Sequence, residues 1–310
     1  MNKINTKKLK ITDISKGYKQ GSIIANRDIS FELLSSEVTA LIGHNGAGKS
    51  TLLNQIMGLV KPDKGEILYD GTSLTKNPKL ARNLVSFMPQ FHAPLAGVTV
   101  QQAIESVLLI HGFRKKDIQT KVNHILTVLD IEQWASVSGE KLSGGLQRLT
   151  SFAMAVVNPS PIILLDEPTN DVDPVRRKYM WIYIKELAKS GSVVVVITHN
   201  LLEVEQYTDR FILLEHGTLR QDERTSNVQK NETSTLTITT LEDYEFRDLP
   251  NAMDITELKK ESQLILALRS EETIEAIEWV LKHIKEGNIL SYKLASSSLN
   301  TFYGGADNDE

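Results

Sequence analysis

Hydrophobic and polar residues alternate along the beginning of the chain with the period of two that predicts β-strands. The stretches "LKITDISKGY" and "RDISFELLSSEVTALIG" follow this pattern, and the second runs into a glycine-rich loop at Gly43. The next stretch, "KSTLLNQIMGL", has a helical period that places Leu52, Leu53, Ile56 and Met57 on one face. We therefore expect a strand that leads through a loop into a helix.

Helices and strands continue to alternate to about residue 220. The period is helical from Val98 to Ser138, where Thr99 followed by Gln102 forms a capping-box pattern. The stretches "IILLDEP" and "VVVVITHN" contain short, fully apolar strands of the kind that is buried in a parallel sheet. Between them "RRKYMWIYIKELAKSG" predicts a helix, and after them "RFILLEHGTLR" predicts a hairpin. This alternation indicates an α/β domain with a largely parallel sheet.

The composition changes after Arg220, where "QDERTSNVQKNETST" is polar and predicts a linker. Beyond it, "LTITT", "LILAL" and "ILSYKL" predict strands. The stretch "SEETIEAIEWVLKHIKEG" predicts a helix whose apolar face carries Ile274, Ile277, Leu281 and Ile284. The expected parts are an α/β domain over 1–222 with a helical subdomain at about 91–150, a linker at 223–234, a small α+β domain over 235–303, and a disordered tail at 304–310.

The composition argues against several functional classes. The chain has 310 residues, no cysteine and a net charge of −4. Disulfides and thiolate metal sites are therefore excluded, and no overall basic excess favours nucleic acid. The longest apolar runs, such as "VVVVI", are far shorter than the roughly 20 residues of a transmembrane helix. No apolar segment follows the charged N-terminus, so a signal peptide is not expected. We expect a soluble protein, or one held at a membrane by another chain.

The loop from Gly43 to Ser50 matches the phosphate-binding pattern G-x-x-x-x-G-K-[ST] between a predicted strand and a predicted helix. Gly46 and Gly48 allow backbone N–H groups to turn inward and approach phosphate oxygens closely. The following helix presents its positive N-terminal end to the same place. Lys49 can reach the β- and γ-phosphates, and the Ser50 hydroxyl can ligate Mg²⁺. A glycine-rich turn that binds nothing is the alternative, but it would not require these residues together.

The acidic pair at the end of "IILLDEP" narrows the choice among phosphate-loop families. Asp166 ends a predicted buried strand, where its carboxylate can hold Mg²⁺ directly or through water. Glu167 beside it is a candidate general base for the water that attacks the γ-phosphate. The alternative is that the pair caps the next helix. The phosphate loop upstream favours the catalytic interpretation.

Together with "EKLSGG" from Glu140, these motifs resemble the ATPase subunit of ATP-binding cassette (ABC) transporters over about residues 5–220. The resemblance implies ATP and Mg²⁺ as cofactors. The residues that match its adenine-stacking aromatic and its phosphate loop are Tyr18, Gly43, His44, Asn45, Gly46, Ala47, Gly48, Lys49, Ser50 and Thr51. Its catalytic glutamate and switch histidine correspond to Glu167 and His199, and Gln90 corresponds to the glutamine that senses Mg²⁺ and the attacking water. The implied Mg²⁺ ligands are Ser50, Gln90 and Asp166.

The resemblance also implies that two such domains close head to tail around ATP. The residues that would contact the nucleotide of the other domain are Ser143, Gly144, Gly145 and Asp173. The implied fold is an α/β P-loop NTPase of the ABC-ATPase type, with a mixed-sheet core, a helical subdomain and a small C-terminal α+β domain.

The resemblance implies two protein partners. One is a second ABC ATPase domain, identical or different. The other is an integral membrane permease subunit, which would hold this cytoplasmic protein at the inner face of the cell membrane. We expect the permease to dock on the surface around Gln90 and Val98–Ser138. No nucleic acid is expected as a partner.

The signature motif departs from the family pattern at one position. Leu146 follows the second glycine, where the family usually has glutamine. Gln147 and Arg148 then come one place earlier than usual. Since Ser143, Gly144 and Gly145 are present and can still meet an anionic ligand, we expect this half of the site to work, with altered coupling.

The C-terminal extension bears on the kind of transporter. With its end "SLNTFYGG", it is similar to the tails of ATPase subunits in ABC-2 type exporters of drugs, antibiotics or polysaccharides. We therefore expect an ATPase that drives export. One alternative is that the extension is a regulatory or dimer-stabilising module without a specific substrate class. Another is that the chain is a non-transport ABC ATPase acting on nucleic acid or the ribosome. The transported substrate does not follow from the sequence.

Overall fold

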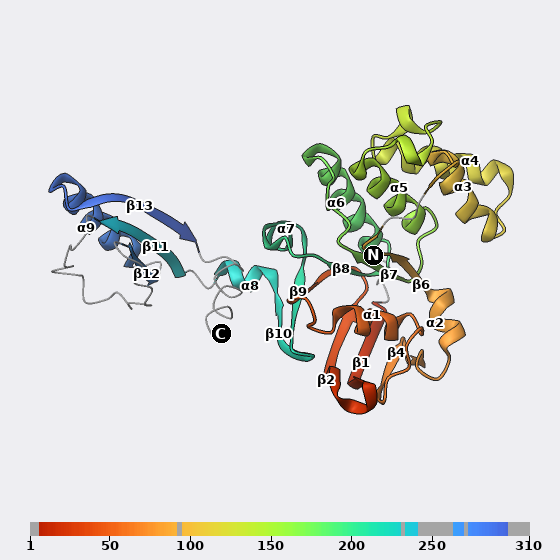
Figure 1. Ribbon diagram of the computed structural model, residues 1–310, viewed down its shortest axis with the longest axis horizontal. Coiled ribbons are helices and arrows are strands. Elements are labelled where there is room, and N and C mark those ends of the chain that lie inside the picture. Colours follow the sequence, from red (N-terminus) through yellow and green to blue (C-terminus); the bar gives the residue numbers. More distant parts are fainter. Residues whose placement is uncertain (1–5, 92–94, 231–232, 241–262, 270–271, 297–310) are drawn as a thin grey trace. The chain divides into compact units, whose positions relative to one another are not determined.

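The computed structural model of the chain describes residues 6–91, 95–230, 233–240, 263–269 and 272–296 (Figure 1). Packing contacts divide the chain into a cassette unit, Met1–Glu223, and a C-terminal unit, Arg224–Glu310. Some expected features lie outside the described residues, namely the tail at 304–310, the stretch "SLNTFYGG", and the part of the small domain at 241–262.

A six-stranded sheet forms the centre of the cassette unit, in the order β10-β9-β3-β8-β7-β6. The strands from β9 to β6 run parallel. A two-residue turn of His216 and Gly217, both with positive φ, joins β9 to β10. Strands β7 and β8 lie inside the sheet, which explains their almost wholly apolar sequences. The strand bounds are β3 (Val38–Ile42), β6 (Val85–Met88), β7 (Ile162–Asp166), β8 (Val193–Ile197), β9 (Arg210–Glu215) and β10 (Thr218–Arg224).

A four-stranded antiparallel sheet, in the order β2-β1-β4-β5, covers one side of helix α1 (Lys49–Ile56). Figure 1 shows β1, β2 and β4 side by side. One hydrophobic cluster joins Leu9 and Ile29 of this sheet to Leu52 of α1 and Leu164 of the central sheet. The phosphate-loop helix is therefore held between two sheets. The strand bounds are β1 (Lys8–Tyr18), β2 (Ile23–Leu34), β4 (Lys64–Tyr69) and β5 (Thr72–Ser73).

Helices cover the other face of the central sheet. Their shared core includes Val122, Phe152 and Trp181 from the helices and Leu165 and Val194 from the sheet. The capping box expected at Thr99 is present, because its side chain accepts the Gln102 N–H while the Gln102 side chain accepts the Thr99 N–H. The helices of the cassette unit besides α1 are α2 (Pro78–Leu84), α3 (Val100–Ile110), α4 (Lys115–Val128), α5 (Gly144–Val156), α6 (Pro174–Lys189) and α7 (Leu201–Tyr207), with short 3₁₀ turns at Lys19–Gly21, Glu132–Trp134 and Gly139–Lys141.

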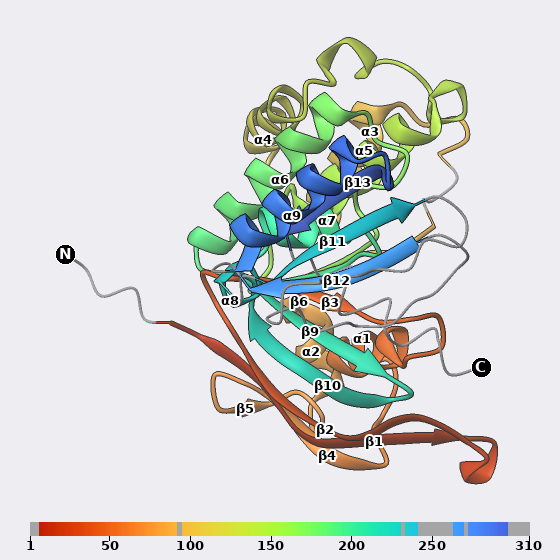
Figure 2. The same ribbon diagram turned by 90° about the vertical axis from the view of Figure 1, so that its left-hand side faces the viewer.

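In the C-terminal unit, helix α9 (Thr273–Lys285) packs on an antiparallel sheet in the order β12-β11-β13 (Figure 2). The strand bounds are β11 (Thr233–Thr240), β12 (Gln263–Arg269) and β13 (Ile289–Ser296). The predicted elements are found here, but the predicted apolar face of the helix is only partly right: Ile284 packs against the core of this unit, whereas two of the four residues are exposed. Ile274 is 71% exposed and Leu281 44% exposed, whereas Ala276, Trp279 and Val280 are buried. Burying the indole of Trp279 removes more apolar surface from water than burying an isoleucine, so the tryptophan edge faces the sheet.

The polar stretch at 223–234, which was expected to be a linker, contains regular structure. Strand β10 continues to Arg224 and helix α8 (Thr225–Lys230) follows directly. Thr225 is only 3% exposed. Polar composition reports on solvation and not on backbone hydrogen bonding, so it did not indicate this helix.

Candidate functional site

The glycine-rich loop joins β3 to α1 at the carboxyl end of a parallel strand, as predicted. Gly48 precedes the helix with a φ of 96°, and a Cβ there would lie 2.1 Å from the carbonyl oxygen of Ala25. Only glycine fits this position. A Cβ at Gly46, by contrast, would meet no atom within 4 Å, so the loop opens into free space at that point. The backbone thus forms a cradle that is closed beneath Gly48 and open above Gly46.

A cavity of about 320 Å³ lies over this loop. It brings together predicted residues from distant parts of the chain. The predicted residues that line it are Tyr18, Asn45, Gly46, Ala47, Gly48, Lys49, Ser50, Thr51, Gln90, Asp166, Glu167 and His199. Of the remaining loop residues, Gly43 and His44 contribute carbonyl groups that accept hydrogen bonds from the Lys49 ammonium, at 3.0 Å for His44. The phosphate loop and the carboxyl ends of strands β1, β6, β7 and β8 therefore meet in one place.

Sequence analysis missed several residues of the cavity. Ile23, Ile24 and Ala25 line it beside Tyr18. The sequence did hold a usable signal, because two adjacent isoleucines interrupt the alternation of the strand. In the structure these two side chains are 48% and 46% exposed. Asn26 was also missed; it is fully buried, and its side-chain amide donates to the Gly48 carbonyl at 3.2 Å. These residues form the wall of the loop on the side of β2.

Lys49 is a buried cation at the start of α1. Burial lowers the pKa of its ammonium, and the carboxylates of Glu167 and Asp166 raise it. The ammonium is held by carbonyl oxygens of its own loop. It therefore lies where it can exchange these neutral acceptors for phosphate oxygens without crossing the site.

The two carboxylates stand at the end of β7. Glu167 has a φ of 50°, and its N–H donates to the Ile197 carbonyl at 2.9 Å, which turns the chain sharply after Asp166. Burial raises the pKa of Asp166. Burial and the charge of Asp166 raise the pKa of Glu167 to about 7. Such a group can accept a proton near neutral pH, as a general base must.

His199 follows β8 and faces Glu167. Its Nε2 lies 3.3 Å from Glu167 Oε1. Burial, together with the positive charge of Lys49, lowers the pKa of His199, so the imidazole is neutral at pH 7. Glu167 Oε1 is buried, and apart from this contact with the imidazole it has no hydrogen-bond partner among the described residues. A buried acceptor of this kind fits a bound water or substrate proton.

The site fits Mg²⁺ only in company with phosphate. Among the described residues, no group of three or more His, Asp or Glu side chains could hold a metal ion. Asp166 and the Ser50 hydroxyl line the same cavity as the loop that would cradle phosphate. Mg²⁺ is commonly bound by one or two protein oxygens completed by phosphate oxygens and water, which matches this donor set.

The predicted signature residues lie away from this cavity. Ser143 caps α5 and accepts the Leu146 N–H at 3.4 Å, and Gly144 and Gly145 form the first turn of the helix. Asp173 caps α6 and accepts the N–H groups of Val175 and Arg176. None of the four lines the cavity. Their contact with a nucleotide bound to another domain stays a prediction.

Known proteins share this sequence pattern. The family model described as "ABC transporter" matches residues 26–170. The Nod factor export ATP-binding protein I of Sinorhizobium fredii is 31% identical over 209 residues, which make up 67% of this chain and 60% of that protein. The ABC-type organic anion transporter ABCA8B of Mus musculus is 32% identical over 216 residues, 68% of this chain and 13% of that protein. The chain thus spans less than two thirds of the length of these relatives.

Solved structures share the fold. The ATP-binding subunit of an ABC transporter superposes with a TM-score of 0.65 at 25% identity, covering 72% of this chain and 92% of that one. A dimeric bacterial ABC transporter cassette superposes with a TM-score of 0.62 at 28% identity, covering 70% and 98%. The fold and the loop therefore define a P-loop NTPase.

Within that class, the chain belongs to the ABC transporter family. The predicted fold class is confirmed, and membership of this family supports ATP hydrolysis by the cassette. None of the helices in the described residues combines the length and the apolarity needed to cross a membrane.

The raised pKa of Glu167 predicts a loss of stability as pH rises in Mg²⁺-free and nucleotide-free buffer. The carboxyl group titrates near 4.5 when unfolded and near 7 when folded. Between these values the folded protein holds more protons, so the free energy of unfolding falls with increasing pH and levels off above about 7. Glu167→Gln removes this titration. Relative to wild type, the variant should gain about 2 to 3 kcal/mol between pH 5 and pH 8 in urea unfolding. A constant difference across this range would contradict the burial of an ionisable Glu167.

Proposed function

We propose that the chain is the ATP-binding and ATP-hydrolysing subunit of an ABC transporter, and that it dimerises on ATP to drive a separate membrane-spanning subunit, in an exporter. The observation that carries this proposal is the single cavity that gathers the phosphate loop, Gln90, Asp166, Glu167 and His199. A turn that binds nothing would not collect a buried and a half-buried carboxylate, a buried lysine and a histidine around an open glycine loop.

The lining residues of the cavity fall into one group that suits a base and another that suits phosphates. Tyr18, Ile23 and Ile24 form the first group, and an aromatic ring with flanking aliphatic groups suits stacking on adenine. The N–H groups of the loop and the N-terminus of α1 form the second group and suit phosphate oxygens. Lys49 would contact the β- and γ-phosphates.

Hydrolysis would depend on four side chains around the γ-phosphate. Glu167 would accept a proton from the attacking water, and Lys49 and His199 would stabilise charge on the transferring phosphoryl group. Gln90 would orient the water. Mg²⁺, held by Ser50, Asp166 and Gln90, would neutralise phosphate charge when bound.

Completion of the site would require a second domain. The N-terminus of α5 with Ser143, Gly144 and Gly145, and the loop with Asp173, lie outside the cavity of their own domain. In a head-to-tail dimer they would contact the γ-phosphate bound by the partner, so ATP would favour the closed state. A solved relative of the cassette is described as dimeric, which supports this arrangement.

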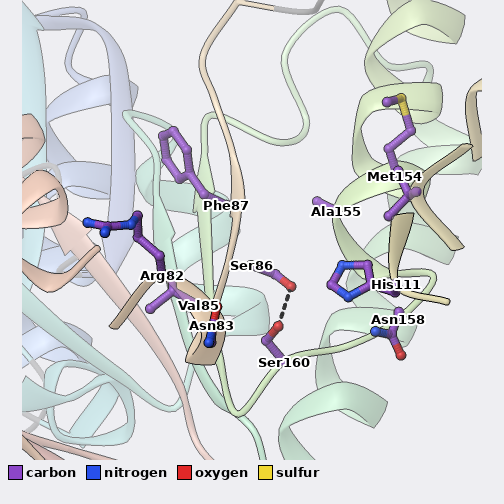
Figure 3. A pocket seen from close by; sticks show the side chains of 11 residues that line it. Arg82, Asn83, Val85, Ser86, Phe87, His111, Met154, Ala155, Asn158 and Ser160 are labelled. Carbon is purple, nitrogen blue, oxygen red and sulfur yellow. Dashed lines mark hydrogen bonds between the residues drawn. The ribbon is translucent and has the colours of Figure 1, made fainter. Parts of the chain in front are cut away.

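A second pocket, of about 350 Å³, suits a permease (Figure 3). It lies among α2, β6, α3 and α5 of the cassette unit, and Figure 3 shows Ser86 hydrogen-bonded to Ser160 between Phe87 on one side and His111 and Met154 on the other. Large apolar side chains are exposed at the end of α3, where Leu109 is 61% and Ile110 84% exposed. An apolar patch beside a pocket is typical of a protein interface, and we assign it to a cytoplasmic helix of the permease. This contact would hold the chain at the inner face of the membrane.

The relatives favour export over the alternatives. The Nod factor proteins are named as export ATP-binding proteins, and ABCA8B is named as an organic anion transporter. These names support a transporter over an ATPase that acts on nucleic acid or the ribosome. Identical subunits and different subunits both satisfy the proposed dimer.

Glu167→Gln tests the catalytic assignment. The amide cannot accept the proton of the attacking water, so steady-state ATP hydrolysis should fall by about 10² to 10⁴. ATP should still bind, and the variant should accumulate as a dimer in size-exclusion chromatography with Mg²⁺ and ATP. Glu278→Gln, on α9 of the C-terminal unit, is the matched control and should hydrolyse ATP at the wild-type rate. Wild-type turnover in Glu167→Gln would contradict the proposed role.

Ile110→Glu tests the proposed docking patch. A buried glutamate would oppose contact with the permease, so the variant should shift from the membrane fraction to the soluble fraction of its native cells. ATP hydrolysis by the purified variant should stay at the wild-type level. The matched control is Ile182→Glu, at a 46% exposed position on α6, which should stay with the membrane. Equal loss in both variants, or in neither, would count against the assignment of this patch.

A further inference from the structure

Arg148 is a buried cation that the proposed chemistry leaves unused. It lies on α5, the helix that begins with the signature glycines, and is 3% exposed. It does not line the nucleotide cavity. Burial lowers the pKa of its guanidinium, and the charges of Asp166, Glu167 and Asp171 raise it. A buried charge away from the substrate needs a structural or positional reason.

The hydrogen bonds of Arg148 within the described residues all go to backbone carbonyl groups of the site. Its Nε donates to the Glu167 carbonyl at 2.9 Å, and one terminal nitrogen donates to the carbonyls of Asp166, at 2.6 Å, and Glu167. The other terminal nitrogen donates to the carbonyls of Pro89, at 3.3 Å, and Gln90. One guanidinium therefore joins the end of β7 to the segment after β6.

The residues held in this way are those whose side chains face the cavity. Gln90, Asp166 and Glu167 come from two segments far apart in the sequence, and no other hydrogen bond between described residues joins the carbonyls of these two segments to one side chain. A planar guanidinium carries five N–H donors in a fixed fork, so it can hold both segments at once. A lysine ammonium at the same place is a compact point charge without this planar fork of donors.

Gln147, the residue before Arg148, holds the signature loop. Its side-chain amide donates to the carbonyls of Gly139 at 3.0 Å and Leu142 at 3.3 Å. Adjacent side chains of one helix thus hold the loop before Ser143 on one side and the hydrolytic segments on the other. A shift of α5 relative to its own sheet would therefore disturb the bonds of Arg148, and the signature loop, held to the same helix by Gln147, would move with it.

We propose that Arg148 is a positioning residue that fixes Gln90 and Glu167 relative to each other, and that with Gln147 it couples the signature loop to the hydrolytic site of the same domain. This inference rests on the proposed function. It also gives a role to the shifted position of this arginine in the signature helix. The following residue, Leu149, is fully buried in the apolar core. The predicted effect is on turnover and not on nucleotide binding, because the hydrogen bonds of Arg148 go to backbone carbonyls and Arg148 itself does not line the cavity.

Arg148→Lys and Arg148→Met in the full-length chain test the proposal by steady-state kinetics. Loss of the fork should displace the catalytic side chains and lower kcat by about 10-fold to 100-fold, while KM for ATP stays within about twofold. Arg148→Lys should be impaired nearly as much as Arg148→Met, because the fork and not the charge alone does the positioning. Arg114→Met, whose side chain is 87% exposed, is the matched control and should keep wild-type kinetics.

Two further measurements separate positioning from a general loss of structure. Added guanidinium ion should partly restore kcat in Arg148→Ala but leave Arg114→Met unchanged. The effects of Gln147→Ala and Arg148→Lys on kcat should be non-additive, because both act on one helix.

The outcomes that would overturn the proposal are distinct. Wild-type kcat in Arg148→Lys, a raised KM with unchanged kcat, no rescue by guanidinium in Arg148→Ala, or strictly additive effects would each overturn it. Absence of ATP hydrolysis in the wild-type chain would instead contradict the proposed function.

Discussion

Two adjacent carboxylates at the end of a parallel strand, one buried and one half-buried, are the constraint on which this structure depends. Water cannot solvate Asp166 and Glu167 fully, and each charge opposes the other, so the pair is tolerable only where positive groups surround it. Lys49 supplies one such group from the phosphate loop, and Arg148 supplies another from α5. The same arrangement leaves one carboxylate with a pKa near neutrality. The burial that makes these charges unfavourable thus also raises the pKa that lets Glu167 act as a general base.

The parallel sheet explains why these groups meet. Strands β3, β7 and β8 are neighbours that run in the same direction, so the residues after each strand lie at one edge of the sheet. The phosphate loop follows β3, the acidic pair ends β7 and His199 follows β8. The antiparallel sheet adds Tyr18 and two isoleucines from a different direction. Helix α5 closes the arrangement, since its side chains reach both the signature loop and the strand ends.

Much of the site could be predicted because each part has a local sequence signal. The phosphate loop, the apolar strand before Asp166 and the capping pattern at Thr99 depend on residues close in the chain, and the fold agrees with each. The apolar face of α9 was predicted only in part, because the choice between Ile274 and Trp279 depends on the sheet that the helix meets. Helix α8 and the hydrogen bond of the Asn26 amide were not predicted for a similar reason. Their signals are hydrogen bonds and contacts with distant residues, which a period of polar and apolar positions does not record.

The central claim is that this cavity binds a nucleoside triphosphate through its loop and Lys49. Isothermal titration calorimetry of the full-length chain with ATP and Mg²⁺ tests it most directly, with Lys49→Ala for comparison and Lys185→Ala on α6 as a surface control. The account predicts saturable binding to wild type and to the control, with affinity reduced by at least about tenfold in Lys49→Ala, since a charge-assisted contact to phosphate is worth roughly 1.5 to 3 kcal/mol. No binding to wild type, or equal affinity in Lys49→Ala, would contradict it.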